Sequence, residues 1–490
     1  MSSRNPRRIA LFALAALLLF VVVLLKLPLA DFVRALEGHD LARAVLSRKR
    51  LVFAIVGSFA LVVTGWLVFR RQFKVLLACV IAGVLAAVTY AVYEFQQTYP
   101  RADFFSLERY GDDLRILLGK DALLSRYQPQ ATLVLSHEQV QRPAYPAIDV
   151  HFHLESLEPS MTPERLVQAM DAAGIAQIVN LGGWPPDRFA YFADAFAAKY
   201  PGRFILFAKP DPDALMRENG VAEQLEWIKS AARMGARGLK ENKSFGLGQQ
   251  DAAGKLVRVD DQRLAPIWDL AGTLGMPVLI HTGEPASFWK PVDVHNERYG
   301  ELLEHPEWSL YGQAGVPTLK ELMEQRERLL ARHTSTNFIG AHLGMNPDDL
   351  QYAGYLLDKY PNYYVDMSSV VAELGRQPHA AREFFLRYQD RILFGTDGGY
   401  RLEPSGDGWT AERMFRSYFE FLETNNEYTD YPLSDITKQG TWRVYGIDLP
   451  DEVLKKIYVT NAERLIPSEA SVRARLEQLD DHPAARAAPP

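Results

Sequence analysis

Cysteine is almost absent from this sequence, because Cys79 is the only one among 490 residues. A single thiol excludes disulfides within the chain and limits any thiolate metal site to one ligand. An excess of one charge is also missing, since 54 basic and 60 acidic residues give a formal net charge of −6. The basic surplus that attracts nucleic acid is therefore absent, and we expect no nucleic-acid partner.

The first 93 residues differ from the rest in their long uncharged runs. These runs are Ile9–Leu25, Leu51–Phe69 and Val75–Tyr93. Each is close to the ~20 residues that a helix needs to cross the hydrocarbon core of a bilayer. Buried core helices are one alternative, and a cleaved signal peptide is another for the first run alone. Three such runs in so short a segment favour a multi-pass integral membrane protein with the lipid bilayer as partner.

The basic residues around these runs give opposing indications of orientation. The N-terminus and the turn from Arg70 to Lys74 together carry six Lys and Arg, and the loop between the first two runs also carries six. Basic loops stay on the cytoplasmic side, and the first helix usually dominates. We therefore expect the chain after Tyr93 to lie on the external, periplasmic side.

The remaining sequence divides into a connector over 94–129, a folded domain over 130–467 and a mobile tail over 468–490. In the domain, short apolar runs alternate with amphipathic stretches, which is the pattern of βα units around a parallel sheet. The predicted strands are Ala147–Phe152, Gln177–Leu181, Phe204–Ala208, Ala236–Leu239, Pro277–Ile280, Asn337–Gly340, Tyr363–Asp366 and Ile392–Phe394. The predicted helices include Pro163–Ala173, Val221–Met234, Arg263–Leu274, Thr318–Arg332 and Pro347–Tyr360.

Eight βα units in this length predict an α/β fold, a (β/α)8 TIM barrel preceded by three transmembrane helices. A doubly wound open sheet is the alternative, but no Gly-rich loop follows the first strand. Long insertions follow the fifth strand (Glu284 to Val316) and the eighth (Asn425 to Leu449).

The first strand ends in His151-Phe152-His153. Alternate residues of a strand share a face, so both imidazoles are expected to point the same way while Phe152 packs opposite. Two imidazoles at this spacing can hold one divalent ion. The motif is weak by itself, because an HxH sequence arises easily by chance.

Polar residues also follow three later strands. His281 follows the fifth strand, His342 the sixth and Asp397 the eighth. TIM-barrel enzymes place their catalytic groups at this carboxyl end of the strands. A buried structural histidine or a helix-capping aspartate would explain any one of them alone. All five at one rim favour a shared centre.

This arrangement resembles the ligand set of the amidohydrolase superfamily, and in particular its amidohydrolase-related branch, which also contains decarboxylases similar to aminocarboxymuconate semialdehyde decarboxylase. Further similarities are Gly238-Leu239-Lys240, Phe394-Gly395-Thr396-Asp397-Gly398 and the closing 459–465 segment, Val-Thr-Asn-Ala-Glu-Arg-Leu. The resemblance covers about residues 130 to 467 and none of the first 93. It implies an enzyme that acts on a small molecule.

The resemblance implies that His151, His153, His281 and Asp397 bind one divalent metal ion. The chemistry of these ligands favours Zn²⁺, with Mn²⁺ or Fe²⁺ as alternatives. A bound Zn²⁺ lowers the pKa of its water to about 7. Asp397 is then expected to accept a proton from this water as well as to bind the metal, and His342 to act as a general acid/base.

Lys240 leaves one question open. Relatives with two metals carry a carboxylated lysine at this strand, whereas single-metal relatives often keep it unmodified. The neighbouring Glu241 and Lys243 favour an ordinary charged lysine that binds a substrate carboxylate, and therefore one metal; a structural salt bridge is the alternative.

Further candidates for substrate binding lie in the loops at the same end of the barrel. In the insertion after the fifth strand, Arg298 and Lys290 suit an anionic substrate and Trp289 an apolar one, although all three could belong to a solvated helix face. Asp366 and Arg376 are candidates of the same kind.

Three functions are compatible with these residues. The first is a membrane-anchored metal-dependent hydrolase of an amide, lactone or ester, and the second a metal-dependent decarboxylase (a lyase) of an unsaturated or aromatic acid. A non-catalytic receptor or scaffold on a former barrel is the third, but such a barrel would be expected to lose at least one ligand. The oligomeric state is left open, a homo-oligomer included.

Overall fold

A computed structural model describes residues 131–156, 162–399, 411–429, 440 and 442–481. The chain divides into two compact units, Met1–Leu133 and Val134–Pro490, and nearly all described residues belong to the second. The three predicted membrane spans and the connector over 94–129 lie outside the described residues. Among the helices that are described, none has both the length and the apolar character needed to cross a bilayer.

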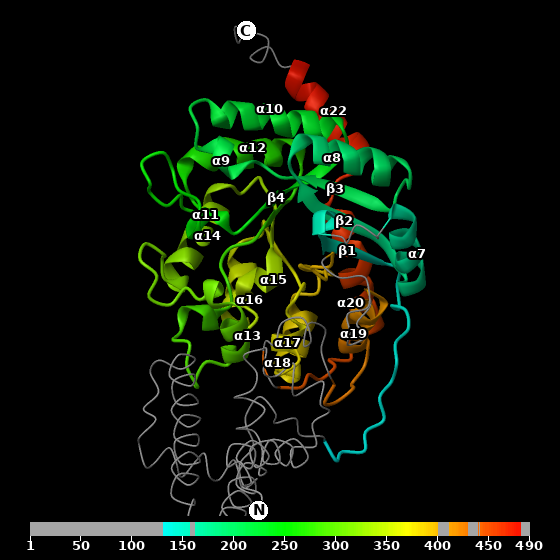
Figure 1. Ribbon diagram of the computed structural model, residues 1–490. Coiled ribbons are helices and arrows are strands. Elements are labelled where there is room, and N and C mark those ends of the chain that lie inside the picture. The colour runs from blue at the N-terminus through cyan, green and yellow to red at the C-terminus, as the bar shows by residue number, and fades with distance from the viewer. Residues whose placement is uncertain (1–130, 157–161, 400–410, 430–439, 441, 482–490) are drawn as a thin grey trace, which may run out of the picture. The chain divides into compact units, whose positions relative to one another are not determined.

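Eight parallel strands follow one another around a single sheet in chain order. They are β1 (Ala147–Phe152), β2 (Ile175–Gly183), β3 (Phe204–Ala208), β4 (Ala236–Glu241), β5 (Val278–Ile280), β6 (Phe338–Gly340), β7 (Tyr363–Asp366) and β8 (Ile392–Leu393). The first and last strands also meet, because Val150 N donates to Phe394 O at 3.0 Å and His153 N donates to Gly398 O at 2.8 Å. The sheet is thus a nearly closed (β/α)8 barrel (Figure 1), which confirms the predicted barrel and shows that the open-sheet alternative is wrong.

Helices and short helical turns connect the strands. They are η2 (Leu154–Ser156), α7 (Pro163–Ala173), α8 (Pro186–Phe192), η3 (Ala193–Ala198), α9 (Pro212–Leu215), α10 (Gly220–Arg233), α11 (Ser244–Leu247), η4 (Gln262–Leu264), α12 (Ala265–Leu274), η5 (Ala286–Trp289), α13 (Tyr299–Glu304), η6 (Pro306–Trp308), α14 (Leu319–Arg332), α15 (Ala341–Met345), α16 (Leu350–Lys359), α17 (Val371–Leu374), α18 (Pro378–Arg387), α19 (Ala411–Glu423), α20 (Asp451–Lys455), η7 (Lys456–Thr460), α21 (Asn461–Leu465) and α22 (Glu469–Asp481). The five predicted helices agree with these bounds to within three residues.

Local signals account for the ends of these helices. Thr318 caps α14 in a capping box, in which its side chain accepts from Glu321 N while the Glu321 side chain accepts from the Thr318 backbone. Thr162 caps α7, and Gly174 ends that helix in the left-handed conformation that glycine adopts readily.

Two apolar layers hold the barrel together. The inner layer fills the barrel with side chains from β1, β2, β3, β5, β6 and β8, and the outer layer lies between the strands and the helices. Inner residues include Val150, Leu181, Phe207, Leu279 and Leu393. Because the interior is packed, only the carboxyl ends of the strands are left to build a site.

The amino end of the barrel is covered by the last described part of the chain. Ala462, Leu465 and Ile466 join the inner layer, and Arg237 near the start of β4 donates to Pro467 O at 2.6 Å. The prediction of a mobile tail from residue 468 is wrong for α22, because its Val472 and Leu476 are buried in the outer layer. Figure 1 shows α22 beside α10 and α12.

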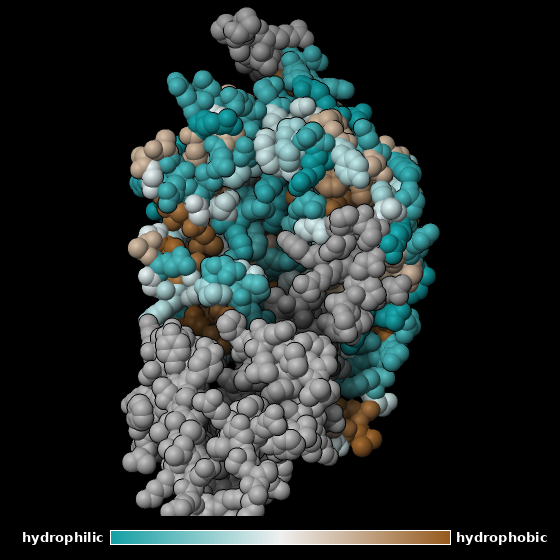
Figure 2. Space-filling model, viewed as in Figure 1, coloured by the Kyte–Doolittle hydropathy of each residue, from teal (hydrophilic) through white to brown (hydrophobic). Residues whose placement is uncertain are grey.

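The face of the barrel seen in Figure 2 is mostly hydrophilic where the residues are described, with small hydrophobic areas between the polar ones. This is the surface expected of a domain whose apolar side chains are used in its two internal layers.

Candidate metal centre

Two histidines at the end of β1 point to the same place, as predicted from their spacing. His151 Nε2 lies 3.2 Å from Asp397 Oδ1, and His153 Nε2 lies 3.3 Å from the same oxygen. Phe152 between them is fully buried in the outer apolar layer. The pairing of β1 with β2 is irregular between Asp149 and Phe152. Val150 therefore fills the barrel interior while the next residue, His151, can also face the site.

Asp397 stands opposite both imidazoles, just after β8. Its backbone N donates to His151 O at 2.8 Å, and its φ of 61° places it in the left-handed region. Burial alone would favour the neutral acid, but the positive charge of His151 and the hydrogen bonds from His151 and His153 hold the pKa of Asp397 well below its usual range. The Asp397 side chain is 25% exposed.

His342 joins the centre from the end of β6. Donor atoms of His151, His342 and Asp397 all lie within 4.8 Å of one another. The ring centre of His342 is 4.9 Å from that of His151 and 4.6 Å from that of His281, at the end of β5. The structure therefore brings His342 and His281 to one place with the β1 pair.

Each of three imidazoles is held by its Nδ1 atom from outside the centre. His151 Nδ1 lies 2.9 Å from Asp366 Oδ2, and His153 Nδ1 lies 2.7 Å from Glu155 Oε1. His342 Nδ1 lies 2.9 Å from Ser368 O. Histidines that bind metals are usually oriented in this way, with one nitrogen held by an oxygen acceptor and the other directed at the ion.

Ser368 joins two of these histidines through one hydroxyl group. Its Oγ donates to Asp366 Oδ1 at 2.6 Å and lies 2.9 Å from His151 Nδ1 and 3.0 Å from His342 Nδ1. The Asp366 carboxylate and the Ser368 carbonyl can only accept, so the Nδ1 atoms of His151 and His342 carry protons. An ion bound at the centre would then meet the Nε2 lone pairs of neutral imidazoles.

Asp366, predicted to bind substrate, is fully buried beneath the site. Burial would raise the pKa of its carboxyl group, but the charge of His151 and the hydrogen bonds it accepts lower that pKa to about 2. It also accepts from the backbone N of His342 at 2.9 Å. The structure thus shows Asp366 orienting His151 and His342.

His281 and Lys240 both lie at the carboxyl ends of their strands, beside the centre. His281 Nε2 and Lys240 Nζ are shielded from solvent and have no hydrogen-bond partner in the part of the chain that the structure describes. Lys240 pairs in register with Leu279, an inner-layer residue two positions before His281. Burial lowers the pKa of His281 well below its usual value and that of Lys240 to about 8.

These observations test whether the centre suits a metal ion. An unpartnered buried imidazole nitrogen is costly unless something binds it, and an ion would satisfy His281 Nε2. Neutral imidazoles with one carboxylate form a donor set typical of zinc. Among the described residues, the donor atoms grouped closely enough to share one divalent ion are those of His151, His342 and Asp397. The predicted set of His151, His153, His281 and Asp397 stays a prediction.

The predicted loop residues have other contacts. Arg298 is buried and pairs with the carboxylates of Glu301, at 3.0 Å, and Glu373. The alternative that it lies on a solvated face is therefore wrong. Arg376 pairs with Glu297 at 2.8 Å, with its guanidinium 4.1 Å from the centre of the Trp442 ring.

The other two loop candidates also have no described contact with the centre. Trp289 Nε1 donates to Pro317 O at 2.9 Å, and Lys290 is exposed. Substrate binding by these loop residues stays a prediction.

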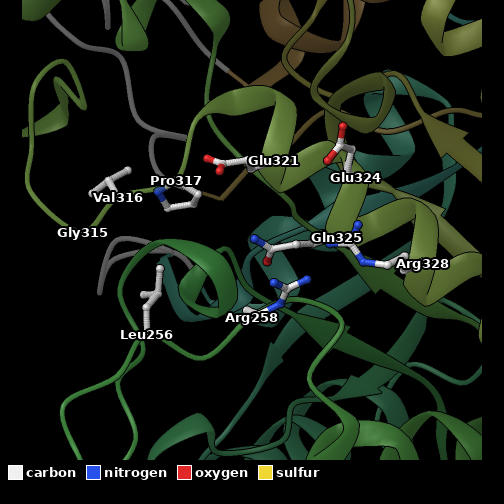
Figure 3. A pocket seen from close by; sticks show the side chains of 9 residues that line it. All are labelled: Leu256, Arg258, Gly315, Val316, Pro317, Glu321, Glu324, Gln325 and Arg328. Atoms are coloured by element: carbon white, nitrogen blue, oxygen red, sulfur yellow. The ribbon is translucent and has the colours of Figure 1, made fainter.

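A separate cavity of about 530 Å³ lies between α14 and the loops that precede it (Figure 3). Its lining includes Arg258 and Arg328, whose guanidinium groups both bond to Asp260. None of the predicted site residues lines it. This cavity is therefore separate from the predicted site residues at the carboxyl ends of the strands.

Glu155 and Ser368 are the functional side chains that the sequence prediction missed. Each follows a predicted residue by two positions, Glu155 after His153 and Ser368 after Asp366. A search for oxygen acceptors near each predicted ligand would have suggested both, because metal-binding histidines need such partners.

Comparison with known proteins gives one matching family and several similar solved structures. A family model described as Amidohydrolase matches residues 148–467. Similar solved structures include 2,6-dihydroxybenzoate decarboxylase from Rhizobium, at 18% identity and a TM-score of 0.41, covering 66% of this chain and 98% of that one. An amidohydrolase from Burkholderia multivorans matches at 13% identity and a TM-score of 0.39, covering 66% and 99%.

A TIM-barrel protein from Bordetella bronchiseptica matches at 18% identity and a TM-score of 0.40, covering 66% of this chain and 99% of that one. No curated protein matches in sequence. The family match spans more than half of the chain and includes every residue of the centre. The chain therefore belongs to the amidohydrolase family of enzymes.

Proposed function

We propose that this protein is a membrane-anchored, metal-dependent hydrolase that cleaves an amide, lactone or ester bond of a small carboxylated substrate. The observation that carries the proposal is the convergence of His151 Nε2 and His153 Nε2 on Asp397 Oδ1, with both Nδ1 atoms held from behind. Such a preorganised set of donors is what a hydrolytic metal site requires.

His151, His153, His281 and Asp397 would hold the ion, with Zn²⁺ favoured and Mn²⁺ or Fe²⁺ as alternatives. When bound, such an ion polarises a substrate carbonyl and makes water acidic enough to react near neutral pH. The unpartnered Nε2 of His281 supports its place among the ligands.

Asp397 and His342 would move the protons. Asp397 keeps its charge, and its second oxygen, Oδ2, accepts from Ser369 Oγ at 3.2 Å, so the carboxylate can take a proton from the attacking water. Burial lowers the pKa of His342 to about 4, so this imidazole is neutral at pH 7. With Nδ1 donating to Ser368, its Nε2 can accept a proton and return it to the leaving group.

Lys240 would bind the substrate's carboxylate. Its ammonium group is buried in the mouth without a partner among the described residues, and an anion there would compensate its charge. In this role Lys240 stays unmodified, and the centre holds a single metal.

Decarboxylation would use the same ligands, with an arginine over the metal to hold the departing carboxylate. The predicted arginines, Arg298 and Arg376, are both occupied by ion pairs. This favours hydrolysis. The presence of all five predicted groups at the centre argues against a non-catalytic scaffold.

The test is an activity screen of the full chain in detergent, stripped of metal and reloaded with Zn²⁺, Mn²⁺ or Fe²⁺. Lactones, acyl amides, esters and enoic acids serve as substrates. We expect release of a carboxylic acid without CO2, lost on chelation and restored by metal. Release of CO2 would instead establish the decarboxylase, and activity that is unchanged by chelation would overturn metal dependence.

The anchor rests on the uncharged runs Ile9–Leu25, Leu51–Phe69 and Val75–Tyr93. If they span the bilayer, the full chain should stay in the membrane pellet after washing with alkaline carbonate. High pH disrupts the electrostatic contacts of peripheral proteins but does not extract apolar helices from the bilayer. A known peripheral protein released by the same wash is the control. Recovery of the full chain in the supernatant would refute the anchor and leave the enzyme unaffected.

We place the barrel on the external side, from the basic N-terminus and Arg70-Arg71. Alkaline phosphatase fused to the C-terminus should then be active, and a green fluorescent protein fused there should be dark. The reverse pattern would place the barrel in the cytoplasm.

A further inference from the structure

The segment that carries His342 has an unusual backbone. Four successive residues of α15 are left-handed: His342 (φ 57°, ψ 50°), Leu343 (φ 54°, ψ 33°), Gly344 (φ 64°, ψ 29°) and Met345 (φ 57°). Residues other than glycine visit this region singly, because their Cβ atoms crowd the following carbonyl oxygen. A strained turn of this length persists only where its surroundings fix it, and such turns gather at functional sites.

One buried arginine holds the outer end of this left-handed turn (342–345). Arg326 of α14 is 1% exposed. Its Nη2 donates to Asn346 Oδ1 at 2.8 Å, and its Nη1 donates to Gly344 O. The guanidinium lies 5.5 Å from the centre of the Tyr363 ring. Both hydrogen bonds therefore end on the turn or on the residue after it.

Among the residues that the structure describes, Arg326 has no counterion to explain its burial. Across the described residues, no carboxylate oxygen lies within 4.0 Å of its guanidinium, and its Nε has no hydrogen-bond partner. A buried cation is costly without a paired anion, so an arginine kept only for stability would be expected to have one. The hydrogen bonds from Arg326 to the turn are therefore the described interactions that compensate the burial of its charge.

The opposite side of the turn is held from within the barrel. Asp366 Oδ1 accepts from His342 N at 2.9 Å, and Ser368 O lies 2.9 Å from His342 Nδ1. Tyr363 packs so closely that a Cβ on Gly344 would lie 2.2 Å from its hydroxyl oxygen. Arg326 thus holds the end of the turn at Gly344, while Asp366 and Ser368 hold its start at His342.

We propose that Arg326 is a positioning residue, which keeps the turn left-handed so that the His342 imidazole faces the metal centre. This inference rests on the proposed function for the role of His342. According to this inference, Arg326 lies on α14, outside the barrel, and affects turnover only by positioning His342.

The test uses the full chain in detergent with three variants. Arg326→Met removes the guanidinium and keeps an unbranched side chain, and Arg326→Lys keeps a charge. Arg328→Met is the matched control, because Arg328 lies on the same helix but bonds to Asp260 beside the cavity of Figure 3. Amide hydrogen exchange over 341–346 is measured on the metal-free protein. Hydrolysis of 4-nitrophenyl acetate is measured on the Zn²⁺-loaded protein.

We expect faster exchange over 341–346 in Arg326→Met, a smaller change in Arg326→Lys and none in Arg328→Met. The kcat of Arg326→Met should fall roughly 10–100-fold with little change in KM. In a His342→Ala background, Arg326→Met should cause no further loss of kcat, because both substitutions remove the same contribution of His342.

Unchanged exchange over 341–346, or losses that multiply in the double variant, would overturn the inference. If Arg326→Met does not fold, the same comparisons with Arg326→Lys decide the question. Wild-type activity in His342→Ala would refute the proposed function, and the exchange measurement would then still decide whether Arg326 holds the turn.

Discussion

Replacing His342 with alanine is expected to slow turnover by about 10²–10⁴-fold, the usual contribution of a general acid/base. The metal content should be unchanged, because the ligands His151, His153, His281 and Asp397 are intact. The measurement is kcat on the substrate found in the activity screen, together with metal analysis of the same sample.

His333→Ala is the matched control for this prediction. His333 is also buried, and its Nδ1 lies 2.8 Å from a carboxylate oxygen of Asp269, at the far end of β6 from the centre. It should lose stability without a comparable loss of kcat. A His342→Ala enzyme with wild-type turnover would contradict the assigned role, and one that has lost its metal would make His342 a ligand.

Asp397→Asn is expected to lower both metal affinity and activity by more than about 100-fold. Substituting a residue that only orients a ligand typically costs about 10–100-fold, and Asp397 is itself a proposed ligand. The substitution keeps the size of the side chain and removes the charge that faces the two β1 histidines at 3.2 and 3.3 Å. Affinity is measured by Zn²⁺ titration of the metal-free full chain, and activity on the reloaded protein.

Asp260→Asn serves as control, because this buried carboxylate pairs with Arg258 and Arg328 away from the centre. It should keep the affinity for metal. An Asp397→Asn variant that binds Zn²⁺ as tightly as the wild type would remove Asp397 from the ligand set.

The barrel and its central residues could be predicted because both depend on short-range patterns. An apolar strand that ends in a polar residue can be recognised from the sequence alone, as at Ile280-His281 or Leu393 to Asp397. Eight parallel strands then place these ends at one rim, whatever the loops do. The predicted strand Gln177–Leu181 is shorter than β2, because Gly182 and Gly183 resemble a turn although they continue the strand.

The roles of Asp366 and Arg298 depend on contacts that sequence spacing does not encode. Asp366 holds His151 from a strand 215 positions later, and Arg298 pairs with Glu373 across 75 positions. Either residue could equally have faced the substrate. Which charged group lies next to a carboxylate that is distant in the sequence depends on the three-dimensional fold.

The left-handed turn at His342 could not be predicted, because Ala-His-Leu-Gly-Met has no signal for it beyond one glycine. Its hydrogen bonds come from Arg326 on α14, Asp366 on β7 and Ser368 in the loop after β7. The mobile tail was a similar error: the Ala- and Arg-rich composition from Ser468 concealed Val472 and Leu476, which α22 places against α10 and α12.

The most direct test of the metal centre is the metal content of the full chain, measured by plasma mass spectrometry after dialysis. The wild type should retain about one divalent ion per chain, and a His151→Ala/His281→Ala variant should retain none, because two of its four ligands, on separate strands, are gone. Equal metal content in the two proteins would contradict the site described here.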